Sequence, residues 1–189
     1  ITCIIISNPQ DVIQLPPDKP GVDTPWDGFT ATQPPLAGDV YTITEPAHLA
    51  WLRDQVNKPV VLPTAKKEYF TGKNFRILNN LNMGGHEWEP IGYDPENAAS
   101  WFSGTIDGLK DDFDHVNESE NGSLIYNFKC TSQNVEYKYF AHGFFTYVKN
   151  ATLKNLRFDG EIIVRDFIST SSITDVGGIV AWSAAVLTM

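Results

Sequence analysis

A short phrase in which Asn precedes a large apolar residue recurs three times, and it constrains the fold more than any other feature of the chain. Its copies are centred on Asn80, Asn127 and Asn155, separated by 47 and 28 positions. From Phe70 onward, short runs rich in β-branched and aromatic residues end at Gly or Asn. Repeats of about 20 to 50 residues that carry strands without crossover helices are typical of a solenoid of stacked β-coils. We expect the recurrent asparagines to form a hydrogen-bonded ladder inside such a stack.

The longer interval between the repeats contains an acidic segment, residues 107–122, which has the composition of a loop insertion. Asp-rich loops can bind Ca²⁺ through carboxylate oxygens, but the spacing here lacks the order of a known calcium loop. A solvated loop is therefore favoured, and no metal or other cofactor is assigned. Asp107 precedes Gly108, so it is interpreted as a turn residue that hydrogen-bonds its own backbone. The charged residues of the segment are Asp107, Lys110, Asp111, Asp112, Asp114, Glu118 and Glu120.

Prolines define the N-terminal part of the chain, because seven of the 12 fall within the first 35 residues. Each proline removes an amide donor and restricts the residue before it, which excludes a continuous helix or a central strand. The sequence predicts a Pro-rich extension over residues 1–38, with short strands at Thr2–Ser7 and Val12–Leu15.

A capping-helix region is predicted over residues 39–69. Its helix is expected from Glu45 to Val56, where Thr44 can cap the first turn, Pro46 suits it, and Asn57 follows the last turn. The apolar face of the helix consists of Leu49, Leu52 and Val56. Because the end of a β-stack needs cover, we expect this helix to pack against the N-terminal end of the coils.

Several phrases of the chain follow one another in an order that is familiar from one protein family. Residues 88–92 read Trp-Glu-Pro-Ile-Gly, and residues 102–108 read Phe-Ser-Gly-Thr-Ile-Asp-Gly. Gly-Phe-Phe and Val at 143–148 precede Ala-Thr-Leu-Lys-Asn-Leu at 151–156, and Val-Gly-Gly-Ile-Val follows at 176–180. This succession resembles the repeats of bacterial right-handed β-helix surface proteins with GLUG-type motifs, which often carry a helix like the predicted one before the first coil.

The resemblance implies a mainly β fold, a right-handed parallel β-helix exposed at a bacterial surface. We expect the coils over residues 70–189, after the Pro-rich extension and the capping helix. The chain departs from the family at Asn80–Met83, which usually reads D-I-D-L, and at the insertion over 108–123, which replaces a short turn. A fourth coil begins close to Met189, so we expect the last coil to be truncated.

Composition excludes some classes of partner. A net charge of -9 and a pI near 4.8 do not favour nucleic acid, and no apolar run reaches the roughly 18 to 20 residues of a membrane-spanning helix. Cys3 and Cys130 are too few for a disulfide framework; lipidation of Cys3 and a bond between the two both stay open. The histidines His86, His115 and His142 fall out of phase with the repeated Asn and predict no metal site.

The predicted function is a non-catalytic adhesion or binding module, extracellular or at the bacterial cell surface, that contacts a glycan or a surface protein. The possible glycan contacts are Trp88, Tyr93 and Trp101, since an aromatic face beside polar groups suits a sugar ring. Trp101 is expected to be exposed, because Phe102 takes the core side of the same strand. For Trp88, a place in the core is at least as well supported.

Two alternative functions are kept. A β-helix scaffold can host a polysaccharide lyase or hydrolase, which would pair Asp107 with a carboxylate of the acidic segment. No catalytic residue is assigned, however, because neighbours on a loop have no fixed separation, and only Lys110 is at hand for an acidic substrate. The second alternative is a purely structural surface stalk.

Overall fold

The computed structural model describes residues 24–58, 67–92, 100–108, 122–132, 139–164, 173–176 and 178–184. The short strands predicted at Thr2–Ser7 and Val12–Leu15 lie outside these ranges. The helix and strands within them are β1 (Leu36–Ala37), β2 (Val40–Ile43), α1 (Pro46–Val56), β3 (Lys67–Tyr69), β4 (Asn74–Ile77), β5 (Leu81–Asn82), β6 (Ser100–Phe102), β7 (Thr105–Asp107), β8 (Ser123–Ser132), β9 (Tyr139–His142), β10 (Phe145–Lys149), β11 (Thr152–Lys154), β12 (Leu156–Val164), β13 (Ile173–Val176) and β14 (Val180–Ala184).

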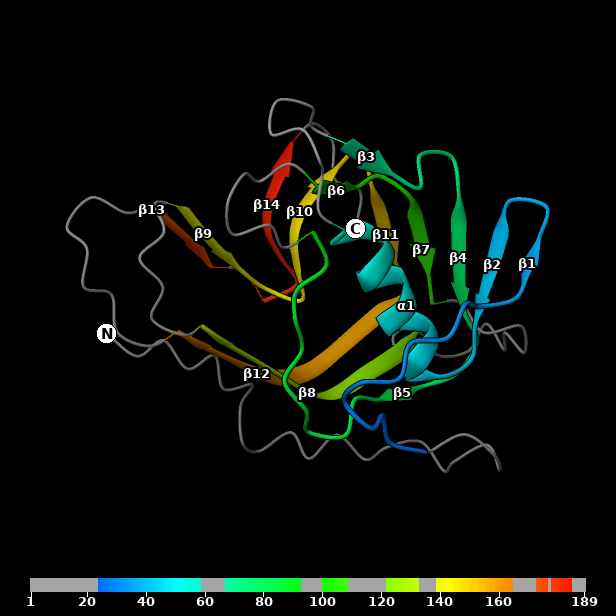
Figure 1. Cartoon of the computed structure of the whole chain (residues 1–189), viewed down its shortest axis with the longest axis horizontal. Helices are drawn as coiled ribbons and strands as arrows, with labels where there is room; N and C mark the ends of the chain where they lie inside the picture. Colours follow the sequence, from blue (N-terminus) through cyan, green and yellow to red (C-terminus); the bar gives the residue numbers. More distant parts are fainter. Residues whose placement is uncertain are drawn as a thin grey trace.

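Strands from successive stretches of the chain pair in parallel and form stacked sheets (Figure 1). One sheet has the order β1-β2-β4-β7-β11, a second β14-β10-β6-β3, a third β12-β8-β5, and β13 pairs with β9. Among the described pairs only β1 and β2 are antiparallel. Three successive coils, β4–β6, β7–β10 and β11–β14, therefore lie one after another, which is consistent with the predicted parallel β-solenoid.

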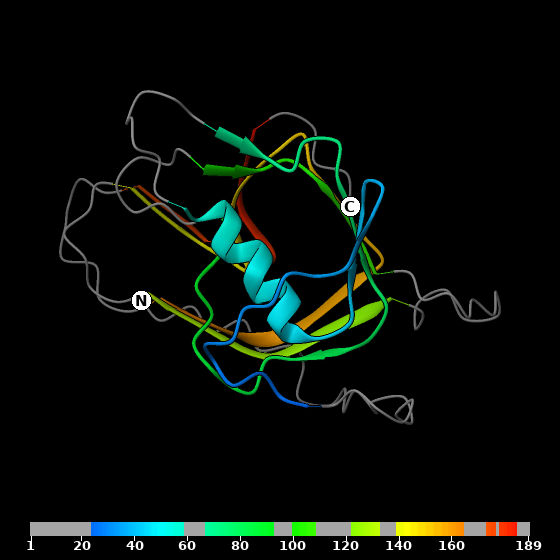
Figure 2. The same ribbon diagram turned by 45° about the vertical axis from the view of Figure 1, so that its right-hand side comes forward.

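Helix α1 covers the N-terminal end of the stack and crosses the opening of the ring that the strands form (Figure 2). The apolar residues predicted for its inner face, Leu49, Leu52 and Val56, are completely buried. The predicted helix is confirmed to within one residue, with Asn57 at its C-cap. The predicted cap is wrong: Glu45 is the N-cap and makes no side-chain capping bond, while the Thr44 N–H donates to Nδ1 of His48 over 3.2 Å.

The core runs along the stack as a series of aromatic contacts. Tyr41 stacks on Phe75 with ring centroids 4.8 Å apart, Phe75 contacts Phe102 at 6.0 Å, and Phe102 contacts Phe145 at 5.9 Å. These residues come from β2, β4, β6 and β10, so the contacts join the cap region to the second coil. Burial of such rings is the main term that holds successive coils together.

The three repeated asparagines do not form the expected ladder. Asn80 accepts a hydrogen bond from the Leu124 N–H at 3.0 Å, whereas Asn127 and Asn155 donate to Asn82 and Asp107, respectively, at 3.1 and 2.7 Å. Asn80 and Asn155 precede strands at corners of the coil, but Asn127 lies inside β8. The repeated phrase therefore occurs at different positions of the coil, which a comparison of sequence phrases alone does not reveal.

Candidate functional site

The two described tryptophans among the predicted glycan contacts are buried. Trp88 is 2% exposed, stacks on Phe144 with centroids 4.8 Å apart, and donates through Nε1 to the Phe144 carbonyl over 3.3 Å. Trp101 is 3% exposed, so the expectation of an exposed indole is wrong. Neither ring can stack on a sugar in this conformation, and Tyr93 lies outside the described residues.

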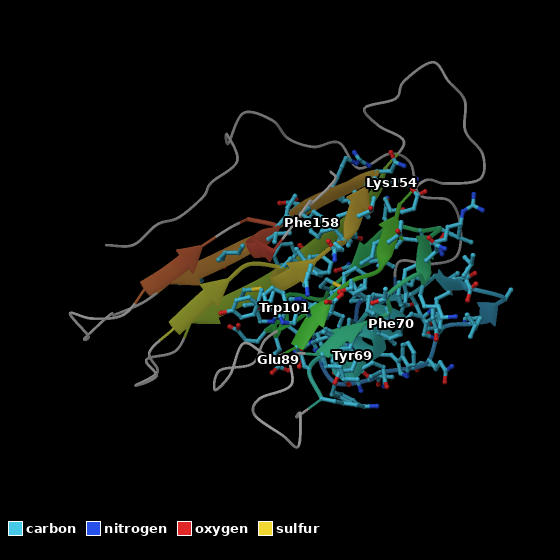
Figure 3. The ribbon with its side chains drawn as sticks, turned by 90° about the horizontal axis from the view of Figure 1, so that it is seen from above. Tyr69, Phe70, Glu89, Trp101, Lys154 and Phe158 are labelled. Atoms are coloured by element: carbon cyan, nitrogen blue, oxygen red, sulfur yellow. The ribbon has the colours of Figure 1, made fainter. Side chains whose placement is uncertain are left out.

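The sequence placed Trp101 on the correct side of its strand but could not predict its cover. Phe102 belongs to the core cluster, whereas Trp101 does not and packs instead on Tyr147, with centroids 5.6 Å apart. Strand alternation indicates the direction of a side chain and says nothing about what covers the outer face of the sheet. Tyr147 is itself only 9% exposed, so neither ring offers an open face to solvent. Trp101 is labelled in Figure 3.

Asp107, the best candidate for a catalytic carboxylate, joins two coils. Its Oδ1 accepts a hydrogen bond from Nδ2 of Asn155 at 2.7 Å, and its Oδ2 lies 3.0 Å from Nζ of Lys154. Lys154 is also its register partner on β11. These contacts suit a carboxylate that links β7 to the next coil. The other acidic residues proposed as its catalytic partners, and as calcium ligands, lie outside the described residues.

The Trp-Glu-Pro-Ile-Gly phrase forms a loop that is hydrogen-bonded to the start of β10. The Ile91 N–H donates to the Phe144 carbonyl at 3.1 Å, and the Ile91 carbonyl accepts from the Thr146 N–H at 2.7 Å. At its end, Gly92 has φ +86°, and a Cβ at this position would lie 2.6 Å from the Tyr147 carbonyl oxygen. Only glycine combines this backbone conformation with so close an approach.

A second feature of the N-terminal end is a tight turn over residues 26–30, which we call the Phe29 turn. The Asp27 carboxylate accepts hydrogen bonds from the backbone N–H groups of Phe29 and Thr30 at 3.0 and 2.8 Å, and from the Thr30 hydroxyl. These hydrogen bonds lower the pKa of Asp27, and the bond from the Thr30 hydroxyl has the largest effect. The Trp26 indole closes the turn by donating from Nε1 to the Thr30 carbonyl over 2.8 Å.

The Phe29 turn is fixed to the body of the molecule on both sides. The Trp26 N–H donates to the Asn82 carbonyl at 2.9 Å, and the Thr32 N–H donates to the Ala47 carbonyl at 3.0 Å. Figures 1 and 2 show this blue segment beside the green trace that follows β5. Gly28, at φ +89°, lies so close to His86 that a Cβ would be 2.9 Å from the imidazole. The turn is therefore held by contacts to β5, to α1 and to the loop after β5.

The guanidinium of Arg53 packs against two indole rings at the base of the same turn. The Trp26 indole is 4% exposed, and the guanidinium carbon of Arg53 lies 5.3 Å from the centroid of its ring and 5.0 Å from that of Trp88. Nη2 of Arg53 is also 2.7 Å from the Asp54 carboxylate. The two indoles contact each other in a T-shaped pair with centroids 5.7 Å apart, and the cation beside both rings favours this packing by electrostatic attraction. The base of the turn is thus rigid.

Phe29 projects from this rigid base into solvent. Its side chain is 78% exposed, and the other exposed large apolar residues among those described, Leu36 and Val40, are 47% and 36% exposed. Sequence reasoning missed Phe29 because it lies in the Pro-rich segment interpreted as a linker. The available signal was Asp27-Gly28, a turn dipeptide placed between two aromatic residues.

The outer faces of the coils are lined with paired charges. Glu87 lies 3.7 Å from Lys129, and its carboxylate also accepts hydrogen bonds from the backbone and hydroxyl of Thr131. Lys149 binds Glu68 across the sheet that contains β3 and β10. Opposite charges on neighbouring strands stabilise the register of the coils by small amounts each. Glu87 and Glu68 thus both have structural partners.

The remaining chemical candidates are inert or outside the described residues. The Cys130 thiol is buried, and burial, followed by the charge of Glu87, raises its pKa to about 12. Cys3 and His115 lie outside the described ranges. Within those ranges, no group of three or more His, Cys, Asp or Glu side chains could hold a metal ion. Among the same residues, no helix has the length and apolarity to span a membrane.

Comparison of the chain with protein-family models, with curated proteins and with solved structures finds no match.

Proposed function

We propose that this chain is a non-catalytic binding module, secreted or exposed at a bacterial cell surface, with the right-handed β-helix fold of GLUG-type surface proteins. Stacked parallel strands with a helix across the N-terminal end support this fold, together with the motif order at residues 88–92 and 102–108. Its ligand is a glycan or a protein partner, and the Phe29 turn is the contact.

The observation that carries the proposal is a phenyl ring held in solvent by a turn that the Asp27 carboxylate and the Trp26 indole hydrogen-bond. Leaving a Phe exposed forgoes about 1.5 to 3 kcal/mol of burial free energy, which a partner that covers the ring would recover. Because the turn is already rigid, little conformational entropy is lost on binding. Asp27 and Thr30 place polar groups beside the ring, an arrangement that suits either a sugar or the edge of a protein pocket.

The test uses the whole 189-residue chain on an array of purified glycans and of purified host and bacterial surface proteins. Phe29→Ala should abolish or strongly weaken binding to any ligand found, with an unchanged melting temperature. Leu36→Ala is the matched control, since it removes another exposed apolar side chain from β1, and it should bind normally.

The enzyme alternative predicts a different result. Incubation with a panel of polysaccharides would release new reducing ends or unsaturated products, and Asp107→Asn would abolish that release. Turnover of this kind would overturn the non-catalytic proposal. Equal binding by wild type and Phe29→Ala would overturn the assignment of the site, and a blank array at high protein concentration would favour the structural stalk.

A further inference from the structure

Phe29 offers both faces of its ring to solvent. The residue is 78% exposed, whereas packing one face on the protein would hide roughly half of a phenyl ring. Among the described residues, no second aromatic ring contacts Phe29 to form a cleft with it. A stacked sugar ring would therefore cover one face and leave the other in water.

This shape differs from that of a site for a small ligand. Such sites are concave and enclose most of the surface of the ligand, while the ring of Phe29 protrudes from the Phe29 turn. A protruding ring is enclosed only when the hollow belongs to the partner. Aromatic side chains that fill a pocket of the partner are the typical energetic centres of protein–protein interfaces.

The hydrogen-bond donors beside the ring are used within the turn. The backbone N–H groups of Phe29 and Thr30 and the hydroxyl of Thr30 all donate to the Asp27 carboxylate. The indole N–H of Trp26 donates to the Thr30 carbonyl. A sugar hydroxyl both donates and accepts hydrogen bonds, and none of these four donors is left for it. The turn suits a partner that brings its own donors.

The Asp27 carboxylate places a negative charge beside the ring. Its side chain is exposed, and the hydrogen bonds that lower its pKa keep it ionised at neutral pH. Among the described residues, no Lys or Arg forms an ion pair with Asp27. A basic side chain of a partner would therefore meet this charge without displacing one of those residues.

We infer that Phe29 inserts into an apolar pocket of a protein partner, and that Lys or Arg side chains at the rim of this pocket face Asp27. The inference rests on the proposed function and narrows its ligand to a protein. A pocket covers both faces of the ring, so it recovers burial free energy that stacking on one side leaves unused. The charges at the rim accelerate association and select the partner.

A small host molecule tests whether a pocket can enclose the ring. β-Cyclodextrin has an apolar cavity that takes up a phenyl ring, and maltoheptaose has the same glucose units in an open chain. The measurement is the NMR spectrum of the whole 189-residue chain, in which the ring signals of Phe29 are those missing from Phe29→Ala. β-Cyclodextrin should shift these signals and maltoheptaose should not. Shifts with neither compound, or equal shifts with both, would overturn the inference.

The array of purified glycans and purified surface proteins tests the class of partner. Binding that Phe29→Ala weakens at least about tenfold should occur on protein spots. There Phe29→Leu should bind more tightly than Phe29→Trp, because leucine fits a pocket shaped for phenylalanine and an indole overfills it. Stacking on a sugar predicts the reverse order, since tryptophan has the larger flat face. The reverse order would overturn the inference.

The array also distinguishes failure of this inference from failure of the proposed function. Phe29-dependent binding to glycans alone would overturn the protein pocket and leave the Phe29 turn as the contact. Binding only to spots of the chain itself would identify a second copy as the occupant and overturn the separate partner. A blank array, or binding that Phe29→Ala leaves unchanged, would overturn both.

Association rates on the protein spots test the basic rim. Asp27→Asn keeps an oxygen that accepts from the N–H groups of Phe29 and Thr30 but removes the charge, so association should slow and depend less on salt. Glu161→Gln is the matched control. It removes one negative charge from an exposed position on β12, two strands from β5 in the same sheet, and should associate like the wild type. Equal effects of the two substitutions, or no effect of Asp27→Asn, would overturn the basic rim.

Discussion

The side chain of Asn57 accepts a hydrogen bond from the Gly92 N–H over 2.8 Å and donates one to the Pro90 carbonyl over 2.9 Å. Asn57 is the C-cap of α1, and residues 88–92 also bond to β10. One amide group thus fastens the end of the capping helix to a loop that is itself anchored in the second coil. The cap and the coils should therefore unfold together.

Asn57→Ala should lower the free energy of unfolding by about 1 to 3 kcal/mol, because a part-buried N–H and carbonyl lose their partners. Chemical denaturation measures this change. Asn57→Asp keeps the acceptor for Gly92 but sets a carboxylate oxygen against the Pro90 carbonyl and a negative charge at the C-terminal end of α1, so it should be at least as destabilising as Asn57→Ala. An alanine variant as stable as the wild type would show that this link contributes nothing.

Gly92→Ala should be more damaging than the same substitution at Gly85. Both glycines have positive φ, +86° and +72°, so both pay about 1 to 2 kcal/mol for the left-handed backbone. At Gly92 the new Cβ would also meet the Tyr147 carbonyl at 2.6 Å, whereas nothing lies within 4 Å of a Cβ at Gly85. Thermal unfolding of the two variants separates the backbone cost, which they share, from the steric clash, which only Gly92→Ala has. Equal destabilisation would refute the steric contribution at Gly92.

The ends of the helix and the inward side of a strand could be predicted from the sequence, because they depend on neighbouring residues. Pro46 and Asn57 set the ends of α1, and the strand alternation of Phe102 placed it in the core. The exposure of Trp101 could not be predicted, because it depends on Tyr147 from a strand far away in the sequence. The rigidity of the Phe29 turn could not be predicted for the same reason, since it comes from contacts to β5 and α1.

Acidification should weaken the capping helix through His48. Its imidazole is buried, its Nδ1 accepts from the Thr44 N–H, and its Nε2 lies 3.5 Å from the Glu45 carboxylate. Burial lowers the pKa of His48, against a smaller opposing effect of Glu45. The unfolded chain therefore binds this proton more readily than the folded one. The stability that neutral His48 contributes to the folded chain is complete above its ordinary pKa of 6.5 and is lost as the pH falls below that value.

Unfolding free energies between about pH 5 and 8 test this, with His48→Gln as the comparison. Glutamine retains an acceptor for the Thr44 N–H but does not titrate, so the difference between the two proteins should shrink as the pH falls from 8 to 5. The three other histidines are present in both proteins, so their effects on the pH dependence cancel in the comparison. Parallel pH profiles would show that His48 has no part in the acid sensitivity.

Cys130 should resist thiol reagents in the folded protein. Its Sγ lies 3.8 Å from the Gly143 carbonyl inside the coil, and a pKa of about 12 leaves almost no thiolate at pH 8. Of the two cysteines, at most Cys3 should react with a chromogenic disulfide reagent under native conditions, and Cys3→Ser should react only after denaturant is added. Rapid native labelling of Cys3→Ser would mean that the coil around β8 opens readily or that this thiol is not enclosed.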